Sequence, residues 1–254
     1  MSFKEKFTDY VNNLFRHDSD FDEAIKYALL PPGKLFRPHL FLNLCKDLDV
    51  NNVTTFYFAT FLEFHHAYTL VHDDLPSMDD SSERRSKPSL HVQYNEAMAV
   101  LVGDALLNQS YAQLNECNLD RKKDLTTFCT WALGFEGLIL GQVEDLFGDD
   151  KVLNSILNIH ELKTSRLIQC ATMGAYYFSG HDDEKIQQDF YKLGLSLGLN
   201  FQIKDDKDDF KSKENDEVNI FNDFSEQAQD LLEKTETEIH LISEKYNLKN
   251  FRKM

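Results

Sequence analysis

Proline and glycine are scarce in this chain. All five prolines lie before residue 89, so the last 166 residues contain none, and the chain has only 10 glycines. Because these two residues most often interrupt regular structure, their scarcity predicts long helices. No segment shows the apolar alternation and regular turn signals of a β-sandwich or barrel. We therefore expect an all-α protein with a single domain over residues 1–254.

Long apolar runs and positive charge are also in short supply. No apolar run approaches 18 residues, and the N-terminus has no apolar signal-peptide segment, so we expect a cytoplasmic protein without stable membrane insertion. The net charge of −16 argues against nucleic acid as a partner. Cys45, Cys117, Cys129 and Cys170 show no metal-ligand spacing and lie in apolar segments, which predicts buried, reduced thiols.

Acidic residues are abundant, and two clusters of them carry most of the information. Asp-Asp occurs six times, so the dipeptide alone means little. The pair at 182–183 is predicted to cap a helix, and the pair at 149–150 to form a turn. The clusters within 71–80 and 198–209 instead follow apolar, helix-like runs. Carboxylates grouped in such a setting need a cation, and ligands that are all oxygen favour Mg²⁺ over Zn²⁺.

The second cluster is predicted to lie on one face of a helix. Asp205 and Asp209 are four residues apart, which places them on the same side. Gln202, Gly198 and Gly194 continue that stripe toward the N-terminus. Glycine is unfavourable inside a helix, so its presence indicates that something approaches closely. The stripe is interpreted as a cavity wall with a metal site at its mouth.

The first cluster cannot be one continuous helix. Pro76 disfavours helical geometry in the residue before it, so the helix should end near Asp74 and a short loop should carry Asp79 back. Asp73 then lies at the negative end of the helix dipole, a poor place for an acid unless a cation binds. His66 lies seven residues earlier on nearly the same face.

Two basic segments accompany the acidic clusters. Lys34 and Arg37 are three residues apart, so a helix would point both in one direction, and residues 83–87 contain Arg84 and Arg85. Arginine is suited to bidentate recognition of phosphate. Magnesium sites flanked by such residues indicate a polyanionic substrate such as a diphosphate.

At these residues the chain resembles the trans-prenyl diphosphate synthases, an all-helical family that elongates isoprenoid chains head to tail, and most of all the bacterial farnesyl diphosphate synthases. The matching motifs occur in family order between about residues 25 and 210. They are Gly33-Lys34-Leu35-Phe36-Arg37-Pro38, His66-Ala67-Tyr68, Asp73-Asp74 with Asp79, Arg84-Arg85, Gly103-Asp104-Ala105-Leu106-Leu107, Gly141-Gln142, Lys163-Thr164, and Phe201-Gln202 with Asp205-Asp206 and Asp209. The resemblance implies an antiparallel helical bundle of the isoprenoid synthase type with a deep central cavity and a divergent helical tail over 223–254.

The resemblance also implies a role for each motif residue. Three Mg²⁺ ions, for which Mn²⁺ can substitute, would bridge an allylic diphosphate to the metal ligands Asp73, Asp79 and Asp205. Asp74, Asp206, Asp209 and Lys163 would complete the catalytic set. The allylic diphosphate would be bound by Arg84, Lys163, Thr164 and Gln202. Isopentenyl diphosphate would occupy a separate pocket formed by Lys34, Arg37, His66 and Arg85.

The implied reaction is Mg²⁺-dependent condensation of isopentenyl diphosphate with dimethylallyl or geranyl diphosphate by a homodimeric prenyltransferase. Tyr68 and Thr69, five and four residues before Asp73, would form the floor that limits the product to farnesyl diphosphate, C15. The glycines at 134, 137 and 141 fit close helix packing or room for an isoprenoid tail.

Two departures from the family pattern keep alternatives open. Ser86 replaces the usual glycine after the paired arginines, and residues 210–223 lack the family's downstream Lys-x-Thr-Tyr-Pro segment, for which Lys211 or Lys213 could substitute. The alternatives are a geranyl or geranylgeranyl diphosphate synthase, a terpene cyclase, a head-to-head synthase, a noncatalytic or weakly active subunit of a prenyl synthase complex, and an acidic helical interaction protein.

Overall fold

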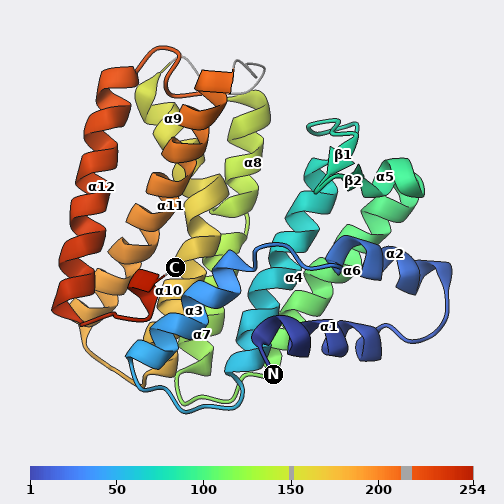
Figure 1. The fold of residues 1–254 in the computed structure, drawn as a ribbon, viewed down its shortest axis with the longest axis horizontal. Helices are drawn as coiled ribbons and strands as arrows, with labels where there is room; N and C mark the ends of the chain where they lie inside the picture. Colours follow the sequence, from blue (N-terminus) through green and yellow to red (C-terminus); the bar gives the residue numbers. More distant parts are fainter. Residues whose placement is uncertain (149–151, 213–218, 254) are drawn as a thin grey trace. The chain divides into compact units, whose positions relative to one another are not determined.

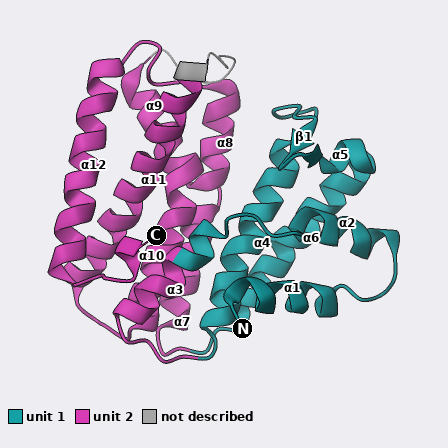
Figure 2. Ribbon diagram, viewed as in Figure 1, with its two compact units in different colours: residues 1–39, 53–118 teal, residues 40–52, 119–254 magenta. Residues whose placement is uncertain are grey.

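Helices make up nearly all the regular structure in the computed structural model, which describes residues 1–148, 152–212 and 219–253. The chain divides into two units (Figure 2). Unit 1 comprises residues 1–39 and 53–118, and unit 2 comprises residues 40–52 and 119–254. The prediction of an all-α fold is confirmed, whereas the prediction of a single domain stays a prediction.

Unit 1 is built around two long helices that pack against each other, α4 and α6 (Figure 1). Its elements are α1 (Phe3–Leu14), α2 (Asp20–Leu29), α4 (Thr55–Asp73), the two-residue strands β1 (Glu83–Arg84) and β2 (Lys87–Pro88), α5 (Leu90–Gln93) and α6 (Glu96–Asn115). Helix α3 (Phe36–Asp47) begins in unit 1 and continues into unit 2.

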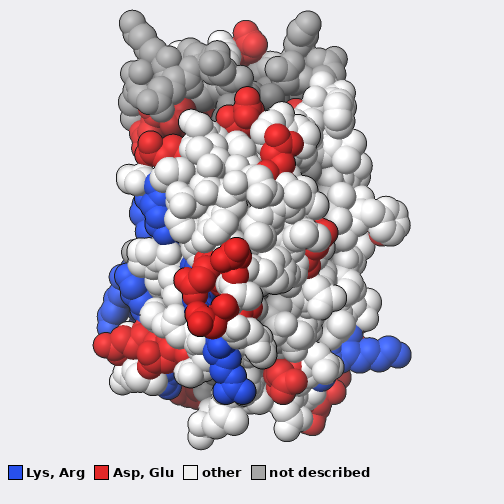
Figure 3. All heavy atoms as spheres, turned by 90° about the vertical axis from the view of Figure 1, so that its right-hand side faces the viewer, with Lys and Arg blue, Asp and Glu red and all other residues white. Residues whose placement is uncertain are grey.

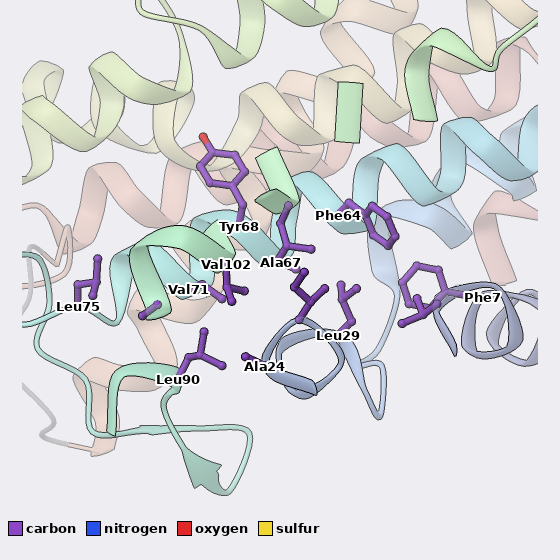
Figure 4. Close-up of a cluster of buried hydrophobic side chains, with 14 residues drawn as sticks. Phe7, Ala24, Leu29, Phe64, Ala67, Tyr68, Val71, Leu75, Leu90 and Val102 are labelled. Carbon is purple, nitrogen blue, oxygen red and sulfur yellow. The ribbon is translucent and has the colours of Figure 1, made fainter. Parts of the chain in front are cut away.

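The core of unit 1 forms on one side of α4. Ala67 and Val71 of α4 pack with Leu29 of α2, Leu90 of α5 and Val102 of α6 (Figure 4). Burial of apolar surface of this kind is the dominant favourable term in folding. The core therefore fixes the C-terminal half of α4, where the first acidic cluster begins.

Unit 2 contains the remaining helices. They are α7 (Lys122–Leu133), α8 (Leu138–Phe147), α9 (Leu153–Ile159), the π-helical segment η1 (His160–Ser165), α10 (Arg166–Phe178), α11 (Glu184–Ser212), α12 (Ser225–Lys245) and the 3₁₀ turn η2 (Phe251–Lys253). Helix α11 packs against both α10 and α12 (Figure 1). Ile203 of α11 is fully buried with Ile156, Ile220 and Leu232, which orients the end of α11 that carries the second acidic cluster.

Two local predictions are confirmed, the helix cap before α11 and the buried cysteine side chains. Asp183 accepts hydrogen bonds from the backbone amides of Lys185 and Ile186 at the start of α11, and Gly180 before it has a positive φ of 73°. All four cysteines are buried, and none of them forms a disulfide within the described residues. Within the described residues, no helix is long and apolar enough to cross a membrane.

Some sequence predictions fall outside the described residues. The Asp-Asp pair at 149–150 is one of them. Lys213, most of segment 210–223 up to residue 218, and the side chain of Lys211 are also outside the description.

Candidate active site

The first acidic cluster forms a tight turn at the end of α4. The helix ends at Asp73, and the backbone amide of Leu75 donates to the carbonyl of His72 at 3.1 Å. The amide of Asp79 then donates to the carbonyl of Asp73 at 2.9 Å. The chain therefore returns to the helix end as the position of Pro76 predicts, and it brings Asp73 and Asp79 onto one turn.

Asp74 faces inward on this turn and fixes a guanidinium group. Its side chain is buried, and its Oδ1 accepts a hydrogen bond from Nε of Arg84 at 2.9 Å and a second from Nη2. This hydrogen bond raises the pKa of Arg84, and the charges of Asp73 and Asp79 act in the same direction. The turn therefore combines two carboxylates with a permanently charged donor that suits a phosphate oxygen.

Arg84 and Arg85 lie on a β-hairpin that is fastened to α2. The hydroxyl of Tyr27 donates to the carbonyl of Pro88 at 2.7 Å, and Nζ of Lys87 donates to the carbonyl of Leu30 at 2.8 Å. Both contacts hold strand β2, the second strand of the hairpin, so the position of the hairpin that carries the two arginines is set by tertiary structure.

The tip of the hairpin carries Ser86, at the position where the resemblance predicts glycine. Arg85 and Ser86 have φ values of 55° and 60°, as in a two-residue turn of type I′. A residue with a Cβ atom costs roughly 1–2 kcal/mol in this left-handed conformation. Ser86 therefore retains the turn at the expense of local strain.

The predicted isopentenyl diphosphate residues gather in part around Arg85. A Cβ atom at Gly33 would lie 3.0 Å from Cζ of Arg85, so that guanidinium lies directly against the backbone before α3. Burial lowers the pKa of Arg37 to about 10, which leaves it charged. Burial and the charges of Arg37, Arg85 and Arg84 hold the pKa of His66 well below its ordinary value. The imidazole is therefore neutral and able to donate one N–H.

Lys34 does not share a helix face with Arg37. Lys34 is exposed and lies before the first residue of α3, and the next residue, Leu35, is buried and has a positive φ of 53°. The helical spacing argument for this pair was wrong. The placement of Lys34 follows from the turn before α3.

Tyr68 belongs to the apolar cluster of unit 1, and its hydroxyl points away from the other labelled side chains (Figure 4). Its ring packs edge to face on His65 at 4.6 Å and on His72 at 5.8 Å between centroids. Burial raises the pKa of Tyr68 to about 12, so the hydroxyl stays protonated. Thr69 donates its hydroxyl to the carbonyl of His66 at 2.8 Å, which satisfies this polar group within α4.

His72 is a further residue of the first motif, to which sequence reasoning gave no role. Its Nε2 lies 3.1 Å from the carbonyl of Val100, and a Cβ atom at Gly103 would lie 1.9 Å from that nitrogen. Glycine at 103 thus makes room for His72 against α6. This contact anchors α4 one residue before Asp73.

The second acidic cluster presents two different faces of α11 in unit 2. Asp205 and Asp209 are exposed, in agreement with their predicted common face. Asp206 instead is buried and accepts hydrogen bonds from Nε2 of Gln202 at 3.0 Å and from the amide of Ile220 at 3.1 Å. Asp206 therefore supports Gln202 from inside the unit.

Lys163 and Thr164 lie on η1. Thr164 donates to Oε1 of Gln202 at 2.8 Å, so these two predicted neighbours are in direct contact. Nζ of Lys163 donates to Asp145 of α8 at 2.6 Å. Sequence reasoning missed Asp145, although it follows Gln142 by one helical turn. Nothing in the sequence indicated that η1, the segment that carries Lys163, would be π-helical. Segments of this kind are frequent at functional sites.

The glycines of α11 and α8 serve helix packing. A Cβ atom at Gly194 would lie 2.7 Å from Cα of Gln169, and one at Gly198 would lie 2.4 Å from Cα of Ser165. A Cβ atom at Gly141 would lie 2.5 Å from the amide nitrogen of Lys163. The glycine part of the α11 stripe is therefore a helix–helix contact within unit 2, which corrects its interpretation as a cavity wall.

The donor set fits magnesium bound together with a substrate. Among the described residues, no three His, Cys, Asp or Glu side chains are grouped so that they could hold a metal by themselves. The exposed donors are carboxylates, and basic groups lie next to them. Mg²⁺ is usually bound by one or two carboxylates together with the phosphates of a substrate. Asp73 and Asp79 of unit 1 are carboxylates of this kind, and so is Asp205 of unit 2.

Comparisons with known proteins agree with this chemistry. The chain is 37% identical to a farnesyl diphosphate synthase from Micrococcus luteus over 200 residues, which cover 77% of this chain and 68% of the relative. A crystal structure of a geranyltransferase from Helicobacter pylori matches with a TM-score of 0.86 at 30% identity and covers 98% of this chain and 92% of that one. A second structure from that organism, complexed with magnesium and isoprenyl diphosphate, matches with a TM-score of 0.83 at 29% identity and covers 98% and 91%.

The fold is therefore that of the isoprenoid synthases, as the motifs predicted. The family model described as polyprenyl synthetase matches residues 18–240, which include both acidic clusters and both basic segments. The chain belongs to the polyprenyl synthetase family.

Proposed function

We propose that this protein is a prenyltransferase that condenses isopentenyl diphosphate with allylic diphosphates, head to tail, to give farnesyl diphosphate. The observation that carries the proposal is the turn after α4, which places Asp73 and Asp79 beside the fixed guanidinium of Arg84. Farnesyl diphosphate synthases and geranyltransferases among its relatives support the same reaction.

The two substrates use different residues. Arg84, Lys163, Thr164 and Gln202 bind the allylic diphosphate, and Asp145 and Asp206 position Lys163 and Gln202 through the contacts described above. The isopentenyl diphosphate is bound by the remaining basic set, Lys34, Arg37, His66 and Arg85. A neutral His66 contributes a hydrogen bond without adding charge to this strongly basic pocket.

The reaction proceeds by ionisation of the allylic C–O bond. Mg²⁺, when bound, supplies positive charge that stabilises the departing diphosphate. Arg84 and Lys163 stabilise the same developing charge through preorganised donors. The double bond of isopentenyl diphosphate attacks the allylic cation, and the released diphosphate takes up the proton that then leaves. No side chain acts as a nucleophile. The family's use of three Mg²⁺ ions, with Mn²⁺ as a substitute, is part of the proposal.

We assign the limit on product length, C15, to the side chain of Tyr68. The ring packs against His65 and His72 at the edge of the unit 1 core, and its hydroxyl points away from the other labelled side chains of that core (Figure 4). A bulky, rigid side chain five residues before Asp73 would stop a growing apolar chain, with Thr69 beside it. If the measured product were C10 or C20, residues other than Tyr68 and Thr69 would limit the length of the product.

We also propose that the enzyme is a cytoplasmic homodimer. Ile139, Val143 and Phe147, spaced by four residues, form an exposed apolar stripe on α8, and such surfaces often mark protein interfaces. Figure 3 shows acidic and basic side chains interspersed on one face, with no broad basic patch among the described residues there, so nucleic acid is not a proposed partner. Four buried cysteines without a disulfide among the described residues fit a reducing compartment.

One assay tests the function. Purified protein is incubated with Mg²⁺, isopentenyl diphosphate and dimethylallyl diphosphate, and the product length is measured by mass spectrometry. A C15 diphosphate that forms with Mg²⁺ and fails to form with EDTA is the expected result. Binding of both substrates without any product would contradict the proposal and favour a noncatalytic subunit.

A further inference from the structure

A buried carboxylate lies beneath the basic pocket of unit 1. Glu63 is on α4, one helical turn before His66, and only 4% of the residue is exposed. Its Oε1 lies 3.9 Å from Nη2 of Arg85. An isolated buried carboxylate is strongly unfavourable, so a residue of this kind is retained where cations compensate it.

Two guanidinium groups from different elements compensate Glu63. Arg37 approaches from α3 and Arg85 from the hairpin tip between β1 and β2, and these are the charged groups that face the carboxylate within the described part of the chain. Burial raises the pKa of Glu63 to about 7, and the charges of Arg85 and Arg37 oppose that shift. The carboxylate is therefore poised between its two forms near neutral pH.

The arginines themselves need a partner of this kind. Nε of Arg37 is buried and has no hydrogen-bond partner among the described residues. Arg85 lies at a strained position with a φ of 55°, and its guanidinium packs against the backbone of Gly33. Among the described residues, neither side chain is held by a direct hydrogen-bonded acid in the way that Asp74 holds Arg84. Their like charges would drive them apart if no anion lay between the elements that carry them.

We propose that Glu63 is a positioning residue for isopentenyl diphosphate, because its carboxylate holds the guanidinium groups of Arg37 and Arg85 in the arrangement that receives the diphosphate. The inference rests on the proposed function, which assigns both arginines to that substrate. Glu63 lies on the inner side of the pocket and touches no reacting atom. Its effect should therefore appear in binding of one substrate only.

The test compares Glu63→Gln, which removes the charge and keeps the shape, with Glu83→Gln as a matched control. Glu83 makes the same charge change two residues before Arg85, but its side chain is exposed. Glu63→Gln should raise the KM for isopentenyl diphosphate by roughly tenfold, an effect typical of removing a supporting partner. The KM for the allylic substrate should stay within about twofold, and Glu83→Gln should resemble wild type for both substrates.

Measurement of the KM for isopentenyl diphosphate over a range of pH shows whether Glu63 acts through its charge or only through packing. In wild type, the KM for isopentenyl diphosphate should rise as the pH falls through about 7, because protonation of Glu63 releases the arginines. The substrate also titrates, so the informative quantity is the ratio of the KM of Glu63→Gln to that of wild type. This ratio should shrink toward 1 at low pH, and Glu63→Asp, which keeps the charge, should restore part of the affinity. A ratio independent of pH would overturn the proposal.

Direct binding separates this inference from the proposed function. Isopentenyl diphosphate is titrated into wild type and Glu63→Gln by calorimetry without an allylic substrate, after thermal unfolding has established that the variant is folded. Failure of wild type to bind would contradict the assigned pocket. Binding by wild type with equal affinity in a folded Glu63→Gln would overturn the role of Glu63 alone.

Discussion

The backbone amide of Asp79 donates a hydrogen bond to the carbonyl oxygen of Asp73, with 2.9 Å between the two atoms. Pro76 lies between them and ends the helix, so five residues of loop return the chain to the helix terminus. The two carboxylates are thus held by main-chain geometry. Arg84 is fixed nearby by the buried Asp74, so two carboxylates and a hydrogen-bond donor that suits phosphate lie close together.

Asp73→Asn should abolish most of the turnover while the fold survives. The amide keeps the shape of the side chain but removes the charge that holds a divalent metal, and metal stabilisation of the transition state is worth several kcal/mol. We expect kcat to fall by roughly a hundredfold or more, since each 1.36 kcal/mol is a factor of ten. Asp80→Asn, an exposed neighbour on the same turn, is the control and should retain turnover. Near-wild-type turnover of Asp73→Asn would refute the metal assignment.

Arg37→Ala and Lys163→Ala should affect different substrates. Arg37 belongs to the pocket around Arg85 in unit 1, whereas Lys163 is held by Asp145 in unit 2. Arg37→Ala should raise the KM for isopentenyl diphosphate, and Lys163→Ala should raise the KM for the allylic substrate, by roughly tenfold or more for loss of a charge-assisted contact. Steady-state kinetics with each substrate varied in turn measures both effects, and each variant serves as the control for the other. If Arg37→Ala raised only the KM for the allylic substrate and Lys163→Ala only that for isopentenyl diphosphate, the two pockets would be assigned to the wrong substrates.

Local features of the fold were predictable from the sequence, and contacts between distant segments were not. Pro76 predicts the end of α4, and the absence of proline after residue 88 predicts the long helices. The side chain of Asp206 faces the interior because its carboxylate contacts the imidazole of His160 and the backbone amide of Ile220. Both residues are far from Asp206 in the chain. A carboxylate that faces a buried imidazole cannot be distinguished by spacing from one that faces solvent.

The same limit applies to residues that were missed. Asp145 and Glu63 gain their roles from partners 18 and 22 residues away. The glycines at 194 and 198 were recognised as sites of close approach, but the sequence does not say what approaches, and the answer is the backbone of residues 165–169. Tertiary structure decides these cases because the approaching group comes from another helix.

Ser86→Gly should stabilise the protein. Ser86 has a φ of 60°, where glycine adopts the conformation without the penalty of a Cβ atom. The free energy of unfolding should rise by about 1 kcal/mol. This corresponds to a rise in Tm of roughly 2–4 °C for a domain of this size. Thermal unfolding measures the effect. Ser82→Gly, at a position without a positive φ, is the control and should lower Tm slightly. A fall in Tm for Ser86→Gly would contradict the strained turn.

Tyr68→Ala should lengthen the product. The ring of Tyr68 packs edge to face on His65 and His72 and is part of the core of unit 1, so thermal unfolding must first establish that Tyr68→Ala is folded. Removal of the ring leaves a space that a growing apolar chain can occupy. We expect wild type to stop at C15 and Tyr68→Ala to give C20 or longer products, measured by mass spectrometry at full consumption of the allylic substrate. Tyr57→Ala removes the same ring from α4 about three helical turns earlier and should leave the product at C15. An unchanged C15 product from Tyr68→Ala would assign the floor to another residue, and a C20 product from wild type would refute the proposed product itself.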